Sequence, residues 1–175
     1  IQFHLIRENN RPVAVDDGSI ASPFLIVAED SGASAPIAVL VNDSDVDLDP
    51  LTVTAASSPN GAVVVNPDGT LTFTPTLDFN GATTLSYTIS DGNGGTSGAT
   101  VYLSVSSVND APVAIAQAVS MDEDGSLAIT LSGSDLDGDI TAEDLDYLVT
   151  MNPLHGTLGV SGRNLVYTPG NNFTG

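Results

Sequence analysis

The stretch Val108-Asn109-Asp110-Ala111-Pro112-Val113-Ala114 decides the fold of this chain, because an earlier stretch resembles it. Its counterpart is Glu8-Asn9-Asn10-Arg11-Pro12-Val13-Ala14, which lies 100 residues earlier. Four further pairs follow in the same order: Ala28-Glu29-Asp30 with Asp122-Glu123-Asp124, Asp45-Val46-Asp47-Leu48-Asp49 with Asp135-Leu136-Asp137-Gly138-Asp139, Leu71-Thr72-Phe73-Thr74-Pro75 with Leu165-Val166-Tyr167-Thr168-Pro169, and Phe79-Asn80-Gly81 with Phe173-Thr174-Gly175. A repeat of this length is a whole domain, so the chain is a tandem array of domains.

The repeats predict the domain boundaries. Residues 10–109 form the first repeat, and residues 110–175 form a second one that we expect to lack its last strands. Residues 1–9 are either the last strand of a preceding repeat or a tag. Ile1, Phe3 and Leu5 are in phase with Val101, Leu103 and Val105 at the same spacing of 100 residues. If the second repeat has an unpaired sheet edge, that edge can recruit such an extended segment from another molecule.

Composition excludes several classes of protein. The 175 residues contain no Cys, which removes disulfides and thiolate metal sites. Lys and Arg number 3 against 22 Asp and Glu, giving a formal net charge of −19. Such a chain repels phosphate backbones, so we expect no nucleic-acid partner. No stretch approaches the ~20 apolar residues of a membrane-spanning helix. A hydrophobic content of 41% argues against disorder despite the acidity.

Short segments of alternating apolar and polar residues predict β-strands separated by Gly, Pro and Asn-Gly or Asp-Gly turns. We expect strands at Pro36–Asn42, Leu51–Ala55, Ala62–Asn66, Thr70–Thr74, Thr84–Ser90, Ala99–Ser106, Ala114–Ser120, Leu127–Leu131, Leu145–Met151, Gly156–Val160 and Leu165–Thr168. Thr141–Leu145 has the pattern of a capping box, which predicts one helical turn there instead of a strand. About seven strands per hundred residues predict an all-β fold of tandem Greek-key β-sandwiches.

The repeats also carry carboxylates in recurring positions. Ca²⁺ takes six to eight oxygen ligands, so a site needs acids and carbonyls from several loops. Asp45 with Asp47, and Asp135 with Asp137, place two carboxylates on one side of an extended loop, and Asp110 lies at the joint between the repeats. Ordinary Asx-turns are the alternative for such loops. An EF-hand loop is disfavoured because Ile140 stands where that loop needs Gly.

These motifs resemble a known family. The segments Val108–Pro112, Glu123-Asp124, Ser134–Asp137 and Tyr167–Pro169 look like the bacterial cadherin-like repeats of large extracellular adhesins of the RTX or biofilm type. The resemblance covers essentially the whole chain. It implies cadherin- or immunoglobulin-like sandwiches, calcium at the junctions between domains, and modules that extend or adhere.

The resemblance also implies the calcium ligands. At the junction between the two repeats they are Glu29, Asn109, Asp110, Asp135 and Asp137, with a weaker match at Asp78, where the Arg-Glu part of the family segment is missing. A preceding junction would use Asp45, Asp47 and Asp91 together with Asn9 and Asn10. Because Asn10 replaces the linker aspartate, we expect that site to be the weaker one.

Catalysis finds little support in the sequence. His4 and His155 are the only imidazoles, and no nucleophile elbow, zinc motif or phosphate loop is present. We therefore expect no enzyme but a calcium-binding structural or adhesive segment of a secreted or cell-surface bacterial adhesin. Its partners would be neighbouring repeats and an unknown cell-surface or glycan ligand. The alternative is a carbohydrate-binding module, for which the absence of Trp is unfavourable.

Overall fold

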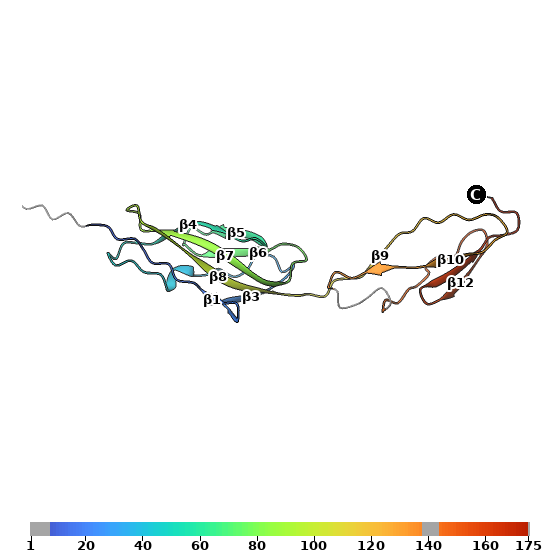
Figure 1. Ribbon diagram of the computed structural model, residues 1–175, viewed down its shortest axis with the longest axis horizontal. Helices are drawn as coiled ribbons and strands as arrows, with labels where there is room; N and C mark the ends of the chain where they lie inside the picture. Colours follow the sequence, from blue (N-terminus) through green and yellow to red (C-terminus); the bar gives the residue numbers. More distant parts are fainter. Residues whose placement is uncertain (1–7, 138–143, 175) are drawn as a thin grey trace, which may run out of the picture. The chain divides into compact units, whose positions relative to one another are not determined.

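The computed structural model describes residues 8–137 and 144–174, which belong to two compact units, Ile1–Val108 (unit 1) and Asn109–Gly175 (unit 2) (Figure 1). Three expectations lie wholly or partly outside the described residues. They are the possible strand at residues 1–9, of which 1–7 are outside, the helical turn that opens at Thr141, and the placement of Asp139. Each unit is described by itself below.

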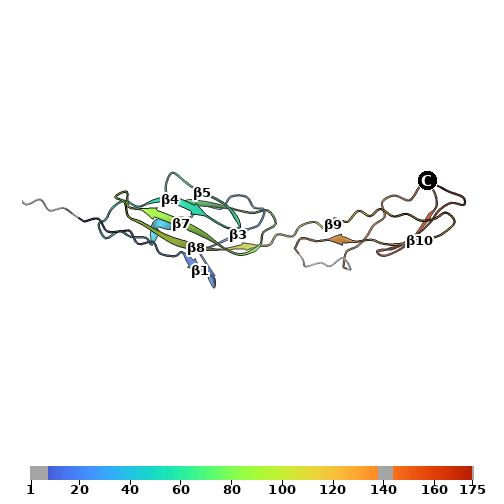
Figure 2. The same cartoon turned by 45° about the horizontal axis from the view of Figure 1, so that its top comes forward.

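Unit 1 is a β-sandwich. Its elements are β1 (Gly18–Ser19), β2 (Ser22–Pro23), β3 (Leu25–Ala28), the 3₁₀ turn η1 (Val39–Val41), β4 (Thr52–Ser57), β5 (Gly61–Val65), β6 (Leu71–Pro75), β7 (Gly81–Ser90) and β8 (Thr96–Ser106). One sheet has the order β3-β8-β7-β4, in which only the β3–β8 pairing is parallel. The other contains β5 and β6 and is extended by a bridge between Ile37 and Leu71. The β1–β2 hairpin projects from the body of the unit (Figure 2).

Strand alternation builds the core of unit 1. Every second residue of β7 from Thr83 to Ile89 is buried, as are three alternate residues of β8. These side chains face those of the second sheet, as period-two alternation requires. The buried core consists of Ile37, Val39, Leu71, Phe73, Leu85, Tyr87, Ile89, Val101, Leu103 and Val105. The chain crosses between the sheets from β4 to β5 and again from β6 to β7, so the predicted Greek-key sandwich is confirmed for this unit.

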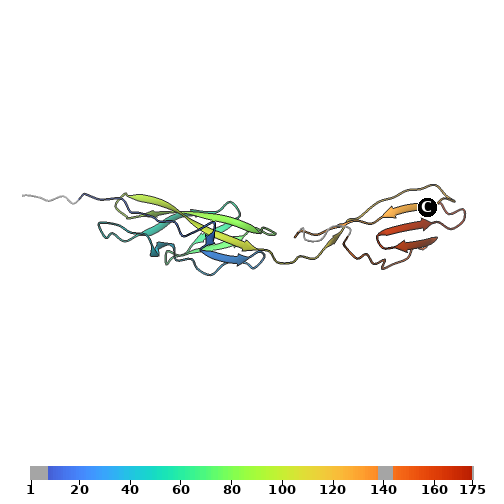
Figure 3. The same cartoon turned by 60° about the horizontal axis from the view of Figure 1, so that its bottom comes forward.

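Unit 2 repeats part of this arrangement (Figure 3). Its strands are β9 (Val113–Ala114), β10 (Leu127–Thr130), β11 (Gly133–Ser134), β12 (Thr157–Ser161) and β13 (Asn164–Thr168). One sheet has the antiparallel order β10-β13-β12, and β9 pairs with β11. The pairing of Val113 with Ser134 repeats the unit 1 bridge between Val13 and Ser44.

Two strand predictions in unit 1 need correction. Pro36–Asn42 does not form a strand: after a single bridge at Ile37 the chain turns through η1. Ile37 and Val39 still enter the core at alternate positions, and the Tyr87 hydroxyl donates to the Val39 carbonyl at 3.3 Å, so a side chain takes the hydrogen bond that a neighbouring strand would make. β3 was not predicted, although Leu25–Ala28 is an apolar run; it pairs in parallel with β8, about 78 residues later in the sequence.

Two predictions in unit 2 were also wrong. Leu145–Met151 is not a strand, and Ala114–Ser120 contributes only its first residue, to β9. The counterpart of Leu145–Met151 is β4, which is held by β7. Since β7 begins at Gly81, the counterpart of Gly175, no strand among the described residues of unit 2 is available to pair with this segment.

Candidate metal sites

Three carboxylates form a cradle at the loop that follows the Val13–Ser44 bridge in unit 1. Oxygen atoms of Asp45, Asp47 and Asp49 lie within 4.8 Å of one another. Asp45 is only 7% exposed, and its Oδ1 accepts the backbone N–H of Asp47 at 2.7 Å. Its Oδ2 is buried and has no hydrogen-bond partner within the described part of the chain. One oxygen therefore makes the Asx-turn, and the other is left for a ligand.

Asn9 and Asn10, the linker residues near the start of unit 1, complete this cradle. Asn10 donates to Asp47 Oδ2 through its backbone N–H at 2.7 Å and through Nδ2 at 3.0 Å. A cavity of about 340 Å³ lies here, bordered by Asp47, Asp49 and Asn9. Polar atoms thus surround a space that is large enough for a hydrated cation.

Asp91, from the turn after β7, lies beside the same linker. It is 2% exposed and accepts Nδ2 of Asn9 at 2.8 Å and the backbone N–H groups of Asn93 and Gly95 at 2.8 and 2.9 Å. These hydrogen bonds, that from Asn9 first, lower the pKa of the Asp91 carboxyl. Asp91 is therefore held ionised and in a fixed position.

Unit 2 repeats two of these contacts with Asp135 and Asp137, the first two acids of its loop. The backbone N–H of Asp110 donates to Asp137 Oδ2 at 2.7 Å, and that of Asp137 donates to Asp135 Oδ1 at 3.1 Å. Asp135 Oδ2 is again buried without a hydrogen-bond partner among residues 8–137 and 144–174. Each contact has its counterpart in unit 1, so two stretches of different sequence converge on one arrangement of carboxylate oxygens.

The chemistry of these cradles fits a hard divalent cation. A buried acceptor without a partner costs about 1–3 kcal/mol, and more when it is charged. Clustered carboxylates add mutual repulsion of about 1 kcal/mol at 4 Å in water and several times that near protein. A bound Ca²⁺ reverses both contributions, because it coordinates oxygen ligands of this kind.

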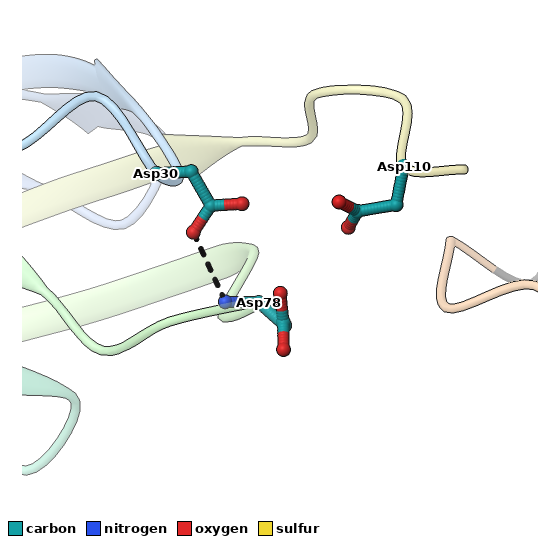
Figure 4. Close-up of side chains that lie close together, drawn as sticks. All are labelled: Asp30, Asp78 and Asp110. Carbon is teal, nitrogen blue, oxygen red and sulfur yellow. Dashed lines mark hydrogen bonds between the residues drawn. The ribbon is translucent and has the colours of Figure 1, made fainter. Parts of the chain in front are cut away.

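Two further acids of unit 1, Asp30 and Asp78, lie close together although they come from different loops. The backbone N–H of Asp78 donates to Asp30 Oδ1 at 3.3 Å, and carboxylate oxygens of the two residues lie within 4.8 Å (Figure 4). Both residues adopt positive φ, 56° and 57°. In unit 2, Asn172 donates to Asp124 Oδ1 at the same 3.3 Å, with φ of 57° and 59°. This contact also recurs between the repeats. Asp110, labelled in the same figure, belongs to unit 2 and is described with it above.

Glu29 connects this end of unit 1 to the exit of β8. It is 2% exposed, its Oε1 accepts the backbone N–H of Val108 at 2.8 Å, and its Oε2 accepts Nδ2 of Asn80 at 3.5 Å. Asn109 uses its amide locally, donating Nδ2 to the carbonyl of Asp110 at 2.8 Å. Glu29 therefore fixes the start of the linker, and Asn109 shapes it.

Sequence reasoning did not select every acid of these clusters. Asp30 and Asp49 were not among the expected ligands, although each stood in a quoted repeat motif: Asp30 beside Glu29, and Asp49 as the third acid of its loop. It also missed Asp17, a buried carboxyl near Asp43 and Tyr87. No spacing signal joins those three residues, because only the sandwich brings them together.

The described part of the chain contains no helix long and apolar enough to cross a membrane.

Solved structures of low similarity include two of the endo-fucoidan hydrolase MfFcnA4 from glycoside hydrolase family 107. They are 22% and 21% identical, cover 94% of this chain and 25% of that chain, and have TM-scores of 0.45 and 0.43. The extracellular domain of protocadherin GammaB4 is 19% identical over 95% of this chain and 30% of that chain, with a TM-score of 0.43. The chain thus spans about a quarter of the length of the first two structures.

None of the curated proteins compared with this chain matches it significantly. The profile of the bacterial Ig domain family matches residues 9–104 and again residues 109–175. The two matches cover most of the sequence and both of its repeats, and the structure has the Greek-key sandwich that such domains require. This chain therefore belongs to the bacterial Ig domain family, as two tandem members.

Proposed function

We propose that this chain is a calcium-binding structural segment of an extracellular multidomain adhesin, in which Ca²⁺ stiffens the joints between consecutive Ig-like domains. The observation that supports it best is the repeated cradle. Asp45 and Asp135 each keep one carboxylate oxygen buried and without a hydrogen-bond partner among the described residues. The same arrangement in two repeats is difficult to attribute to a solvated acidic surface.

The negative charge of the chain also supports the proposal. A formal net charge of −19 opposes compaction, and clustering the acids in loops adds to the repulsion. Cations held at the cradles would remove that repulsion where it is largest. Glu29 and Asp91 would assist, because each is buried and fixed by hydrogen bonds to a linker, at Val108 and Asn9.

The order of residues along the chain indicates that the proposed ion lies at the joint between the two domains. Asp110 stands two residues after Val108, so an ion held by Asp110, Asp135 and Asp137 would sit where one domain continues into the next. In line with the resemblance to cadherin-like repeats, we propose that Glu29 and Asp78 also supply oxygen ligands at that joint. Pro112 restricts the linker backbone further. A chain of such joints would be a rod whose stiffness depends on calcium.

The spacer function agrees with the family. Bacterial Ig domains are typically non-catalytic and usually lie outside the cell or on its surface. Phe73 and Tyr87 are buried in the core of unit 1, Phe24 is 47% exposed, and the chain has no Trp, so few aromatic faces are available as a platform for a sugar. We therefore favour a structural and adhesive function over a carbohydrate-binding module.

The test is calorimetric titration of calcium into the chelator-treated chain, together with thermal melting. We expect saturable binding and a rise in melting temperature. Asp45→Asn and Asp135→Asn should each remove part of the bound calcium, and the double variant should remove most of it. Asp146→Asn is the matched control, since it removes the same charge from an exposed residue outside the clusters.

Binding that is unchanged in the double variant would refute the proposal. So would a melting temperature that does not respond to calcium in the unmodified chain. Small-angle scattering with and without calcium then tests the stiffening separately: binding without any change in the scattering profile would leave a calcium site but no rigid rod.

A further inference from the structure

The Tyr87 hydroxyl lies in a cluster of oxygen atoms inside unit 1. Tyr87 belongs to β7 and is 2% exposed. Both carboxylate oxygens of Asp43 and the backbone carbonyls of Val15 and Val39 lie 3.2–3.3 Å from its hydroxyl oxygen. A hydroxyl has one proton to donate, so it satisfies only one of these four acceptors at a time. The hydroxyl is therefore surrounded by more acceptors than it can serve.

Two other donors reach this cluster, and both are already engaged. The backbone N–H of Val15 donates to Asp43 Oδ1 at 2.8 Å, and Nδ2 of Asn42 donates to the Val15 carbonyl at 3.0 Å. For Asp43 Oδ2 this leaves the Tyr87 hydroxyl, which it shares with the two carbonyls. The cluster thus has unused capacity to accept from, or to coordinate, a positive group.

Asp17 adds a buried carboxylate to the same cluster. Its backbone is fixed on β8, since its N–H donates to the Thr100 carbonyl and its own carbonyl accepts the N–H of Tyr102, both at 2.9 Å. Asp17 is 5% exposed, and its Oδ2 has no hydrogen-bond partner in the part of the chain that the structure describes. Burial, and then the charges of Asp17 and Asp43, raise the pKa of the Tyr87 hydroxyl far above its ordinary value, because both carboxylates lie close to it.

These oxygens have the composition of a calcium site. Asp17 Oδ2, the two carboxylate oxygens of Asp43, two backbone carbonyls and one hydroxyl make six oxygens, and Ca²⁺ takes six to eight. Ligands at about 2.4 Å from a calcium ion lie about 3.4 Å from their neighbours, which is close to the 3.2–3.3 Å found around the hydroxyl. The two carboxylates would also balance the charge of one divalent ion.

A cavity gives this cluster access to solvent. It has a volume of about 310 Å³ and is bordered by Asp17 and Asn42 and by the exposed residues Asp16 and Val41. A hydrated cation can pass through a space of this size. All of these residues belong to unit 1, so the cluster is complete within one domain.

Unit 2 lacks both acids of the cluster. Gln117 stands at the position of Asp17, at the spacing of 100 residues that relates the starts of the repeats. Gly133 stands at the position of Asp43, at the spacing of 90 residues that relates the two Asp-X-Asp loops. Nε2 of Gln117 donates to the Thr130 carbonyl at 2.8 Å, so this neutral side chain is satisfied within the protein. The two acids are absent together, as expected if they share one ligand.

We propose that Asp17, Asp43 and the Tyr87 hydroxyl bind one calcium ion inside unit 1, with the backbone carbonyls of Val15 and Val39 as further ligands. The ion would connect β7, the edge of β8 and the loop after η1 within a single domain. It would therefore stabilise the domain itself rather than a joint. The site uses none of the acids of the two cradles, so it does not depend on calcium at the joints.

Terbium luminescence tests this site separately from the cradles. Terbium(III) replaces calcium at oxygen sites, and it emits strongly when a tyrosine beside it is excited. The titration is made in the Asp45→Asn, Asp135→Asn double variant, in which both cradles are weakened. We expect saturable emission sensitised by tyrosine, and we expect added calcium to compete it away.

Substitution of either acid should then remove the emission while Tyr87 stays in place. Asp17→Asn and Asp43→Asn, each added to the double variant, should lower the terbium affinity by about tenfold or more. Asp146→Asn, which removes the same charge from an exposed residue of unit 2, should leave the affinity unchanged. Melting curves in chelator show that each variant is folded, so that a lost signal reports lost binding.

The hydroxyl is tested by calorimetry, because replacing Tyr87 also removes the sensitiser. Tyr87→Phe in the double variant should weaken calcium binding, whereas Tyr102→Phe, the matched change on β8, should not. A double variant that binds neither terbium nor calcium would overturn the inference, and so would emission that is unchanged by Asp17→Asn. Neither result would affect the cradles, whose calcium is measured by the loss of binding between the unmodified chain and the double variant.

Discussion

The backbone N–H of Asp110 donates to Oδ2 of Asp137 at 2.7 Å, and Asn10 makes the same contact with Asp47 at the same distance in the other repeat. In both domains the linker backbone orients the second acid of the loop, and in unit 1 the Asn10 side chain adds a hydrogen bond from Nδ2 to the same oxygen at 3.0 Å. The linker side chain, Asn10 in one repeat and Asp110 in the other, sets how much negative charge each cradle offers. This difference distinguishes the two proposed calcium sites.

Asn10→Asp should make the unit 1 site resemble that of unit 2. Without calcium we expect a lower melting temperature, because the Nδ2 hydrogen bond to Asp47 is lost and a further acid joins Asp45, Asp47 and Asp49. With calcium the added carboxylate should raise the affinity of this site by about tenfold. Calorimetry and melting with and without chelator measure both effects. Ser86→Asp adds the same charge on the exposed face of β7, and equal affinities in the two variants would contradict the assignment.

Gly95 is required by close packing against Asp91. A Cβ at this position would lie 2.1 Å from Asp91 Oδ2 and 3.0 Å from the Arg11 Cα. Because Asp91 is buried and held by several hydrogen bonds, Gly95→Ala should cost about 2 kcal/mol or more in unfolding free energy. Chemical denaturation measures the loss. Gly159→Ala, whose Cβ would meet its nearest neighbour at 3.8 Å, should cost much less, and a similar loss in both variants would count against this packing argument.

Because Asp17 is a buried carboxyl, we expect the stability of the fold to depend on pH in an unusual way. Burial, and then the charge of Asp43, raise the pKa of the Asp17 carboxyl from 3.8 to about 6. The folded state therefore binds more protons than the unfolded state between these two values. Consequently the contribution of Asp17 to the unfolding free energy increases as the pH falls from about 7 to about 4, by on the order of 2 kcal/mol.

Asp17→Asn removes the buried charge and should stabilise the fold at pH 7. It should also remove the part of the pH dependence that lies between about 4 and 6. Denaturation curves at several pH values in chelator measure both effects without interference from calcium. Asp146→Asn, a change at an exposed acid of unit 2, is the control. If Asp17→Asn destabilises the protein at pH 7 as much as at pH 4, the predicted shift is wrong.

Phe73 and Tyr167 occupy the same position in the two repeats but differ in burial. Phe73 is completely buried between the sheets of unit 1, whereas Tyr167 is partly exposed and lines a cavity of unit 2. Phe73→Ala should cost about 3–5 kcal/mol, because it leaves a cavity in a closed core. Tyr167→Ala should cost clearly less in the monomer. Denaturation at low protein concentration compares the two, and equal costs would mean that unit 2 has a closed core after all.

Local signals predicted much of this structure. The alternation of apolar and polar residues predicted the positions of β4 to β8 to within a few residues. It did so because the side chains of a strand in a two-layer sandwich face the core at every second position. The Asp-X-Asp loops were likewise visible, since both acids and the turn they form lie within three residues of one another. Where structure depends on distant partners, the same reasoning failed, as at η1 and at the parallel strand β3.

The sequence by itself determined that the chain repeats, that its domains are all-β and that their acids gather in corresponding loops, because repeats, alternation and composition are properties of neighbouring residues. Only the tertiary structure decided that one oxygen of Asp45 is buried without a hydrogen-bond partner among the described residues, that Glu29 holds Val108, and that Asp17 is buried near Asp43. These features join residues that are far apart in sequence or depend on burial. Burial and long-range contact arise from how the sheets pack, and no local pattern encodes them.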